Sequence, residues 1–144
     1  ASIGSKLLLE VIPQVFVYDI SPLPQSNEGI TYAEKWDKED CIINWNEPCD
    51  VTLRRIRTCS PNPGAKTTYL GKDLKVYSAH IVTNLTNENN LPGQIVEVNK
   101  VELIVATGNS GYIALDTIQF AGKSKLPIKE ILRGHQFKIG EQLI

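Results

Sequence analysis

Short apolar runs separated by turn-forming residues follow one another along most of this chain, and they predict a protein built mainly of β-strands. No long segment keeps the spacing of three to four residues that marks an amphipathic helix. Pro13 cannot donate to a strand ladder, so it divides the first apolar stretch into two short strands. The expected strands are Lys6–Ile12, Gln14–Ile20, Cys41–Trp45, Asp50–Thr58, Leu74–Val82, Gln94–Val98, Lys100–Thr107 and Gly111–Phe120.

Turn and loop signals lie between these runs. Ser60–Gly64 holds two prolines and a glycine and predicts a chain reversal. Gly108–Ser110 predicts a tight hairpin, because these residues tolerate left-handed backbone conformations. Ser21–Asp40 and Thr83–Pro92 are expected to be exposed loops. The apolar residues of Lys123–Ile144 are spaced ambiguously, so that segment is either a short helix or one more strand.

Composition is that of an ordinary globular protein. The chain has 144 residues, of which 42% are apolar and 22% are charged, so one domain spanning residues 1–144 with a real core is expected. No apolar run approaches the roughly 18 residues that a membrane-spanning helix needs. The chain lacks methionine and begins at Ala1, which indicates a processed or excised piece. With the sequon Asn84-Leu85-Thr86, this favours a secreted or cell-surface protein.

Charge and cysteine content narrow the choice of partners. The net charge of −1 gives no reason to expect a nucleic-acid partner. Residues 28–50 hold seven acids against two lysines, and residues 123–138 hold five bases against one acid, which we interpret as two solvated edges. The spacing of the three cysteines fits no zinc or redox motif. These cysteines are Cys41, Cys49 and Cys59. Two of them could form a disulfide in an exported protein, or all three could be small core residues, and the sequence leaves both alternatives open.

One segment resembles a known family. Residues 101–106, a glycine-bearing turn and residues 112–120 resemble the closing hairpin of galactose-binding-like jelly rolls, which include carbohydrate-binding modules and MAM adhesion domains. This resemblance implies an all-β fold, an antiparallel β-sandwich of jelly-roll type. It also implies a structural calcium ion held by Asp116 and Glu10. The favoured alternative for Asp116 is a carboxylate that accepts backbone hydrogen bonds at a strand end.

Aromatic residues near turns are the candidate binding residues. A sandwich that binds sugar needs exposed rings to stack on the sugar, with amides or carboxylates nearby for its hydroxyl groups. For each ring, ordinary packing is the alternative, and Trp45, which alternates with Ile43, is expected in the core. The predicted ligand-binding residues are Trp36, Tyr32, Tyr69, Asn109 and Tyr112.

Catalytic motifs are missing from the sequence. His80 and His135 lie in different segments, with no nucleophile elbow, metalloprotease motif or phosphate loop beside them. We therefore expect a non-catalytic module that binds a carbohydrate through loop aromatics at one end of the sandwich. The alternative is an adhesion or assembly domain that binds a protein through a sheet face or edge.

Overall fold

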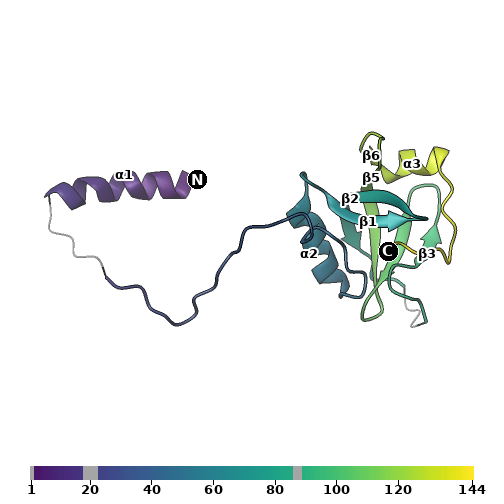
Figure 1. Ribbon diagram of the computed structural model, residues 1–144, viewed down its shortest axis with the longest axis horizontal. Helices are drawn as coiled ribbons and strands as arrows, with labels where there is room; N and C mark the ends of the chain where they lie inside the picture. Colours follow the sequence, from purple (N-terminus) through teal and green to yellow (C-terminus); the bar gives the residue numbers. More distant parts are fainter. Residues whose placement is uncertain (1, 18–22, 86–88) are drawn as a thin grey trace. The chain divides into compact units, whose positions relative to one another are not determined.

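The computed structural model describes residues 2–17, 23–85 and 89–144 and forms two compact units, Ala1–Lys35 and Trp36–Ile144 (Figure 1). The first unit contains helix α1 (Ser2–Val17), which is 16 residues long and has Pro13 inside it. The two strands expected here are wrong, and residues 18–20 of the second lie outside the described residues. The apolar residues of α1 occur mostly in runs of two or three, so the sequence shows neither a helical nor a strand period. Leucine, lysine and glutamate also favour a helix over a strand.

Every described residue of α1 has an exposed side chain. Among the residues that the structure describes, none of the helices is long and apolar enough to cross a membrane. Residues 23–40 hold no helix or strand, which confirms the predicted loop over the part that the structure describes.

The second unit is a small barrel with two helices on it. Its elements in chain order are α2 (Cys49–Cys59), β1 (Ala65–Tyr69), β2 (Lys72–Ile81), β3 (Ile95–Val98), β4 (Leu103–Thr107), β5 (Gly111–Phe120), β6 (Leu126–Pro127) and α3 (Ile128–Gly134). The strands are antiparallel in the order β1-β2-β5-β4-β3, and β6 pairs with β5.

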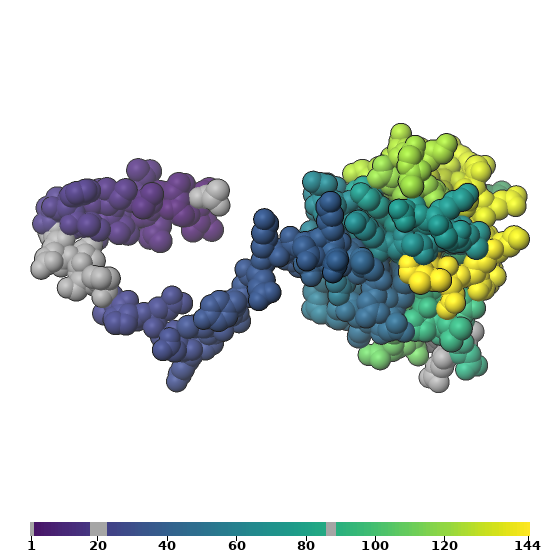
Figure 2. All heavy atoms as spheres, viewed as in Figure 1, coloured from purple at the N-terminus to yellow at the C-terminus, as the bar shows by residue number. Residues whose placement is uncertain are grey.

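The last four residues close this sheet into a barrel. Ile144 and Thr68 exchange backbone hydrogen bonds of 3.0 and 2.6 Å on the β1 side. On the β3 side, the Ile95 amide donates to the Glu141 carbonyl at 2.8 Å, and the Leu143 amide donates to the Gly93 carbonyl at 2.8 Å. Figure 2 shows these C-terminal residues, in yellow, between the two strands that they join. The C-terminal segment therefore covers part of the edges of β1 and β3.

The core lies inside the barrel, where alternate residues of each strand point inward. β1 follows this alternation strictly, with Ala65, Thr67 and Tyr69 buried. Trp45 is only 4% exposed, which confirms its expected place in the core, and its indole N–H donates to the Thr67 hydroxyl at 2.9 Å.

Helix α2 replaces the strand expected over Asp50–Thr58. Its buried residues Thr52, Ile56 and Cys59 are spaced by four and three positions, so they form one helical face. The apparent alternation of Val51, Leu53 and Arg55 was the wrong period. The helix packs on β1, β2 and β5 and covers part of the barrel (Figure 1).

Other expectations have mixed outcomes. The strands at Leu74–Val82 and Gln94–Val98 are confirmed within two residues as β2 and β3, and the Gly108–Ser110 hairpin is confirmed between β4 and β5. Residues 60–63 form the expected turn, although a helix precedes it. Cys41–Trp45 makes a single bridge, Ile42 to Lys66, instead of a strand. The ambiguous tail contains both a short strand, β6, and a short helix, α3, and strand β1 was not expected.

The expected fold class is therefore wrong. An antiparallel jelly-roll sandwich has two sheets facing each other, whereas this unit has one closed sheet with helices against it, and the chain also contains α1. Closure by the C-terminal segment lets residues on one sheet surround the core, so a second sheet is not needed. The three cysteines are free thiols, with Cys41 and Cys59 buried.

Candidate functional site

Two lysines lie directly opposite each other on the outer face of the barrel. Lys66 of β1 pairs with Lys75 of β2, and Lys75 pairs with Gln119 of β5. The neighbours of these residues along each strand, such as Leu74 and Val76, are buried. Because opposite residues of antiparallel strands point to the same face, Lys66, Lys75 and Gln119 form one row on the outside.

A shallow groove runs along this row, and we call it the lysine groove. One hollow of about 300 Å³ is lined by Lys66, Lys75 and Thr68, and a neighbouring hollow of about 180 Å³ is lined by Gln119 and Phe120. Asp73 and Lys75 line both hollows, so the two lie next to each other. The groove thus crosses β1, β2 and β5.

Asp73 lines both hollows of the lysine groove, but Lys66 and Lys75 form no ion pair among the described residues. Within the described part of the chain, no carboxylate lies within 4.0 Å of the ammonium group of Lys66 or Lys75. Like charges directly opposite each other on a sheet disfavour the free protein, so an anion bound between them would be stabilised.

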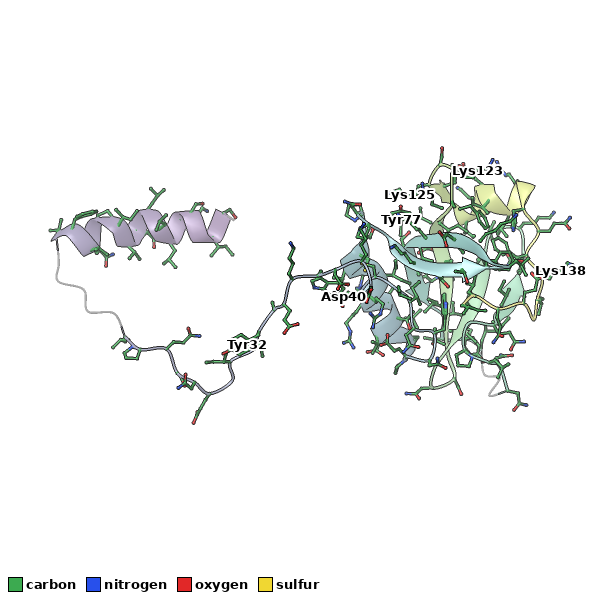
Figure 3. All side chains as sticks on the ribbon, in the orientation of Figure 1. Tyr32, Asp40, Tyr77, Lys123, Lys125 and Lys138 are labelled. Carbon is green, nitrogen blue, oxygen red and sulfur yellow. The ribbon has the colours of Figure 1, made fainter. Side chains whose placement is uncertain are left out.

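A side-chain network adds two more lysines near this face (Figure 3). The Tyr77 hydroxyl donates to the Gln119 side-chain carbonyl at 2.6 Å, and the Gln119 amide donates to the Lys123 carbonyl at 2.8 Å. The Lys125 ammonium lies 4.5 Å from the centroid of the Tyr77 ring, a cation–π contact. The network therefore fixes the turn after β5, and with it Lys123 and Lys125, against the sheet.

The position of the Tyr77 ring depends on a glycine. Gly64 has φ of +84°, and a Cβ atom built there would lie 2.9 Å from two carbons of the Tyr77 ring. A residue with a side chain at position 64 would strain the backbone and push the ring away.

The residues predicted to bind a ligand do not form one cluster in the second unit. Tyr69 and Tyr112 are buried, and Asn109 is exposed in the hairpin turn with φ of +55°. Tyr32, 87% exposed, lies in the first unit, and Trp36, 53% exposed, begins the second.

The two carboxylates proposed for calcium belong to different units. Glu10 is on α1, and the Asp116 carboxylate lies 2.8 Å from Nδ1 of His80 on the outer face of β2 and β5. In residues 2–17, 23–85 and 89–144, no three histidine, cysteine or acidic side chains are grouped so as to hold a metal ion. Lys66 and Lys75 were not singled out from the sequence, because no strand was predicted around Lys66 and its pairing with the strand that contains Lys75 was therefore not expected.

Comparison with known proteins decides the family. Residues 35–136 match the family model described as the C-terminal domain of formyl transferase. The chain belongs to this family. Solved structures of HypX from Aquifex aeolicus share the fold of this formyl transferase domain: one covers 92% of this chain and 24% of HypX with a TM-score of 0.61 and 21% identity.

Curated relatives of this chain are methionyl-tRNA formyltransferases. The Dictyoglomus turgidum protein is 38% identical over 142 residues, which cover 99% of this chain and 45% of that protein. The Acidovorax ebreus protein is 36% identical, with 93% and 42% covered, and the Bacillus subtilis protein is 34% identical, with 97% and 44% covered. The chain thus spans less than half the length of these relatives.

These findings overturn several expectations drawn from the sequence. The resemblance to galactose-binding jelly rolls is wrong, and so are the carbohydrate-binding function and the adhesion or assembly alternative. The relatives are enzymes named for a transfer RNA, so the expectations of a non-catalytic protein, of no nucleic-acid partner and of a secreted or surface protein are wrong as well.

Proposed function

We propose that this chain is the C-terminal portion of an enzyme that transfers a formyl group to an aminoacyl-tRNA, and that its lysine groove contacts the backbone of that RNA. The first support is the match to methionyl-tRNA formyltransferases over nearly the whole chain. The groove gives the proposal a physical basis on this domain.

The observation that carries the proposal is the opposed pair Lys66 and Lys75, two ammonium groups on one face without a carboxylate partner among the described residues. Phosphate groups of an RNA would neutralise this pair and release counterions from the RNA. Lys123 and Lys125, fixed beside the same face, extend the basic surface along a polyanion. Such contacts position an RNA and carry no sequence information directly.

Helix α1 fits the same proposal. Its apolar side chains are exposed, among them Leu9, Phe16 and Val17. An exposed apolar surface of this kind normally packs against another surface. The relatives have more than half of their length outside the match, so we assign the partner of α1, and the groups that react, to that remaining part.

The test is the salt dependence of RNA binding. The 144-residue chain is titrated with a methionine transfer RNA transcript at several salt concentrations, as wild type and as the double variant Lys66→Ala/Lys75→Ala. Each lost phosphate contact lowers the slope of log affinity against log salt by about 0.9, so the double variant should lose a slope of about 2. It should bind more weakly at low salt.

The control is a double variant with the same change of charge, Lys100→Ala/Lys129→Ala. Lys100 lies in the turn between β3 and β4, Lys129 lies on α3, and neither lines the groove. Equal losses of slope in both double variants, or no loss in either, would show that the groove does not hold the RNA.

A further inference from the structure

A third hollow lies next to helix α2, and we call it the Trp36 hollow. Its volume is about 390 Å³, near the lower end of the range for small-molecule sites. It lies between the turn at residues 36–41, the last turn of α2 and the turn at residues 60–63, and its lining residues are Trp36, Asp37, Lys38, Cys41, Thr58, Cys59, Asn62 and Pro63.

The wall that carries Trp36 is held in place by hydrogen bonds. One Asp37 carboxylate oxygen accepts the amides of Glu39 and Asp40 at 2.7 and 3.2 Å. The Asp37 amide donates to the Asp40 carboxylate at 2.9 Å. Arg55 of α2 donates to the Asp40 carbonyl at 2.8 Å and pairs with Glu47 at 2.8 Å. The turn at residues 37–40 is therefore fixed to α2.

The surfaces of the hollow differ in chemistry. The Trp36 indole is half exposed and offers an aromatic face. Cys41 and Cys59 are buried at the hollow, and burial raises the pKa of the Cys59 thiol to about 12, so this side is uncharged and polarisable.

Polar groups complete the lining. Over the described residues, the Asn62 amide and the Lys38 ammonium have no hydrogen bond or ion pair. The Thr58 hydroxyl donates to the Arg54 carbonyl at 2.9 Å and can still accept a hydrogen bond.

From this arrangement we infer that the Trp36 hollow binds an unpaired nucleobase of an RNA, stacked on the Trp36 indole. The inference rests on the proposed function and adds a site for a base to the phosphate contacts of the lysine groove. A flat ring can stack on the exposed face of the indole, and the polar edge of a base needs both donors and acceptors. Asn62 supplies both, Asp37 and Thr58 supply acceptors, and Lys38 can reach a neighbouring phosphate.

Tryptophan fluorescence tests this inference directly, because the chain has only two tryptophans. Trp45 is buried and hydrogen-bonded to Thr67, so a base stacking on the half-exposed Trp36 changes the red-shifted part of the emission. The 144-residue chain is titrated with the four nucleoside monophosphates and with a labelled single-stranded RNA of about ten nucleotides, whose affinity is followed by anisotropy. We expect quenching of Trp36 in both titrations.

Variants separate stacking from charge. Trp36→Ala should bind the RNA about 5- to 100-fold more weakly, the loss typical of one base–aromatic stack. The matched control Trp36→Phe keeps an aromatic face and should retain most of the affinity. Asn62→Ala should weaken binding and reduce the differences among the four nucleotides, since it removes a group that contacts the edge of the base.

The outcomes distinguish this inference from the proposed function. If the chain binds RNA through the lysine groove, while Trp36→Ala binds equally well and Trp36 is not quenched, the inference is overturned and the proposed function stands. If neither transfer RNA nor nucleotides bind, both fail. Quenching by a proline-rich peptide but not by nucleotides would mark a peptide site and would also overturn the inference.

Discussion

The hydroxyl of Tyr69, at the end of β1, donates a hydrogen bond to the carboxylate of Glu141, 72 positions further along the chain. Tyr69 is buried, and its ring centroid lies 4.8 Å from that of Phe137 and 5.8 Å from that of His135. Glu141 opens the C-terminal segment that closes the barrel. The bond therefore fastens the closing segment to the first strand.

Removing this hydroxyl should weaken closure. We expect Tyr69→Phe to lower the thermal midpoint by roughly 3–8 °C, because the ring packing stays while a hydrogen bond to a charged group is lost. Thermal unfolding followed by circular dichroism measures the shift. Tyr32→Phe is the control, since Tyr32 is exposed. Equal midpoints for wild type and Tyr69→Phe would contradict the structural role of this bond.

The bond between Tyr69 and Glu141 predicts that the stability of the barrel depends on pH. Burial, and then the bond to Glu141, raise the pKa of Tyr69 from 10.0 to about 12, while the bond from Tyr69 lowers the pKa of Glu141. A raised tyrosine pKa contributes stability below pH 10 that is lost as pH rises towards 12, and a lowered carboxyl pKa contributes stability above about pH 5 that is lost on acidification.

The difference in stability between wild type and Tyr69→Phe should therefore be largest between about pH 5 and pH 10 and should shrink on both sides. Urea denaturation of both proteins at pH values below about 5, between about 5 and 10, and above about 10 measures it. Burial also raises the pKa of the Cys59 thiol, but that effect is common to both proteins and cancels in the difference. If the stability difference between wild type and Tyr69→Phe does not vary with pH, the ionisation of Tyr69 and Glu141 does not affect folding as we predict.

Gly64→Ala should destabilise the barrel more than the same change at Gly71. Both glycines have positive φ, +84° and +71°, so both variants strain the backbone. Only at Gly64 would the new methyl group meet the Tyr77 ring, whereas nothing lies within 4 Å at Gly71. We expect Gly64→Ala to cost about 1–3 kcal/mol in urea denaturation, and Gly71→Ala less. Equal destabilisation by the two variants would mean that the Tyr77 ring moves aside without a loss of stability.

Removal of residues 1–22 should leave the barrel intact. No described residue of α1 belongs to a hydrophobic core cluster, and residues 36–144 form a compact unit. We expect the thermal midpoint to change by less than about 2 °C, while self-association at high concentration falls because exposed apolar surface is removed. Thermal unfolding and analytical ultracentrifugation measure the two effects. A large fall in the midpoint would show that α1 stabilises the barrel.

Local signals predicted the parts of this fold that depend on neighbours in the sequence. The hairpin of β4 and β5 was expected from its flanking apolar runs and from Asn109 and Ser110, which have φ of +55° and +52° in the turn. Trp45 was expected in the core from its alternation with Ile43, and both are buried. In these cases the residues that decide the structure lie within a few positions of one another.

Helix α2 shows where local signals are ambiguous. Val51, Thr52, Ile56 and Thr58 favour a strand by propensity, and a short segment can be matched to either period. Burial of Thr52, Ile56 and Cys59 against the barrel stabilises the helix instead. Tertiary packing therefore overrode local preference.

The candidate sites also differ in whether local sequence or tertiary contacts decide them. Trp36 was selected from the sequence as an exposed ring in a loop, and it lines a hollow, although the ligand expected there was wrong. Lys66 and Lys75 were not selected, because nothing in the sequence brings these two lysines together. Only the pairing of β1 with β2 makes them neighbours.

The sequence by itself determined which residues are apolar, where the chain turns and which strands form a local hairpin, because these depend on side-chain type and short-range backbone geometry. Tertiary structure decided the closed barrel, the identity of α2 and the opposition of the two lysines. Each of these depends on contacts between distant segments, such as Tyr69 with Glu141, whose stabilisation exists only once the chain has folded.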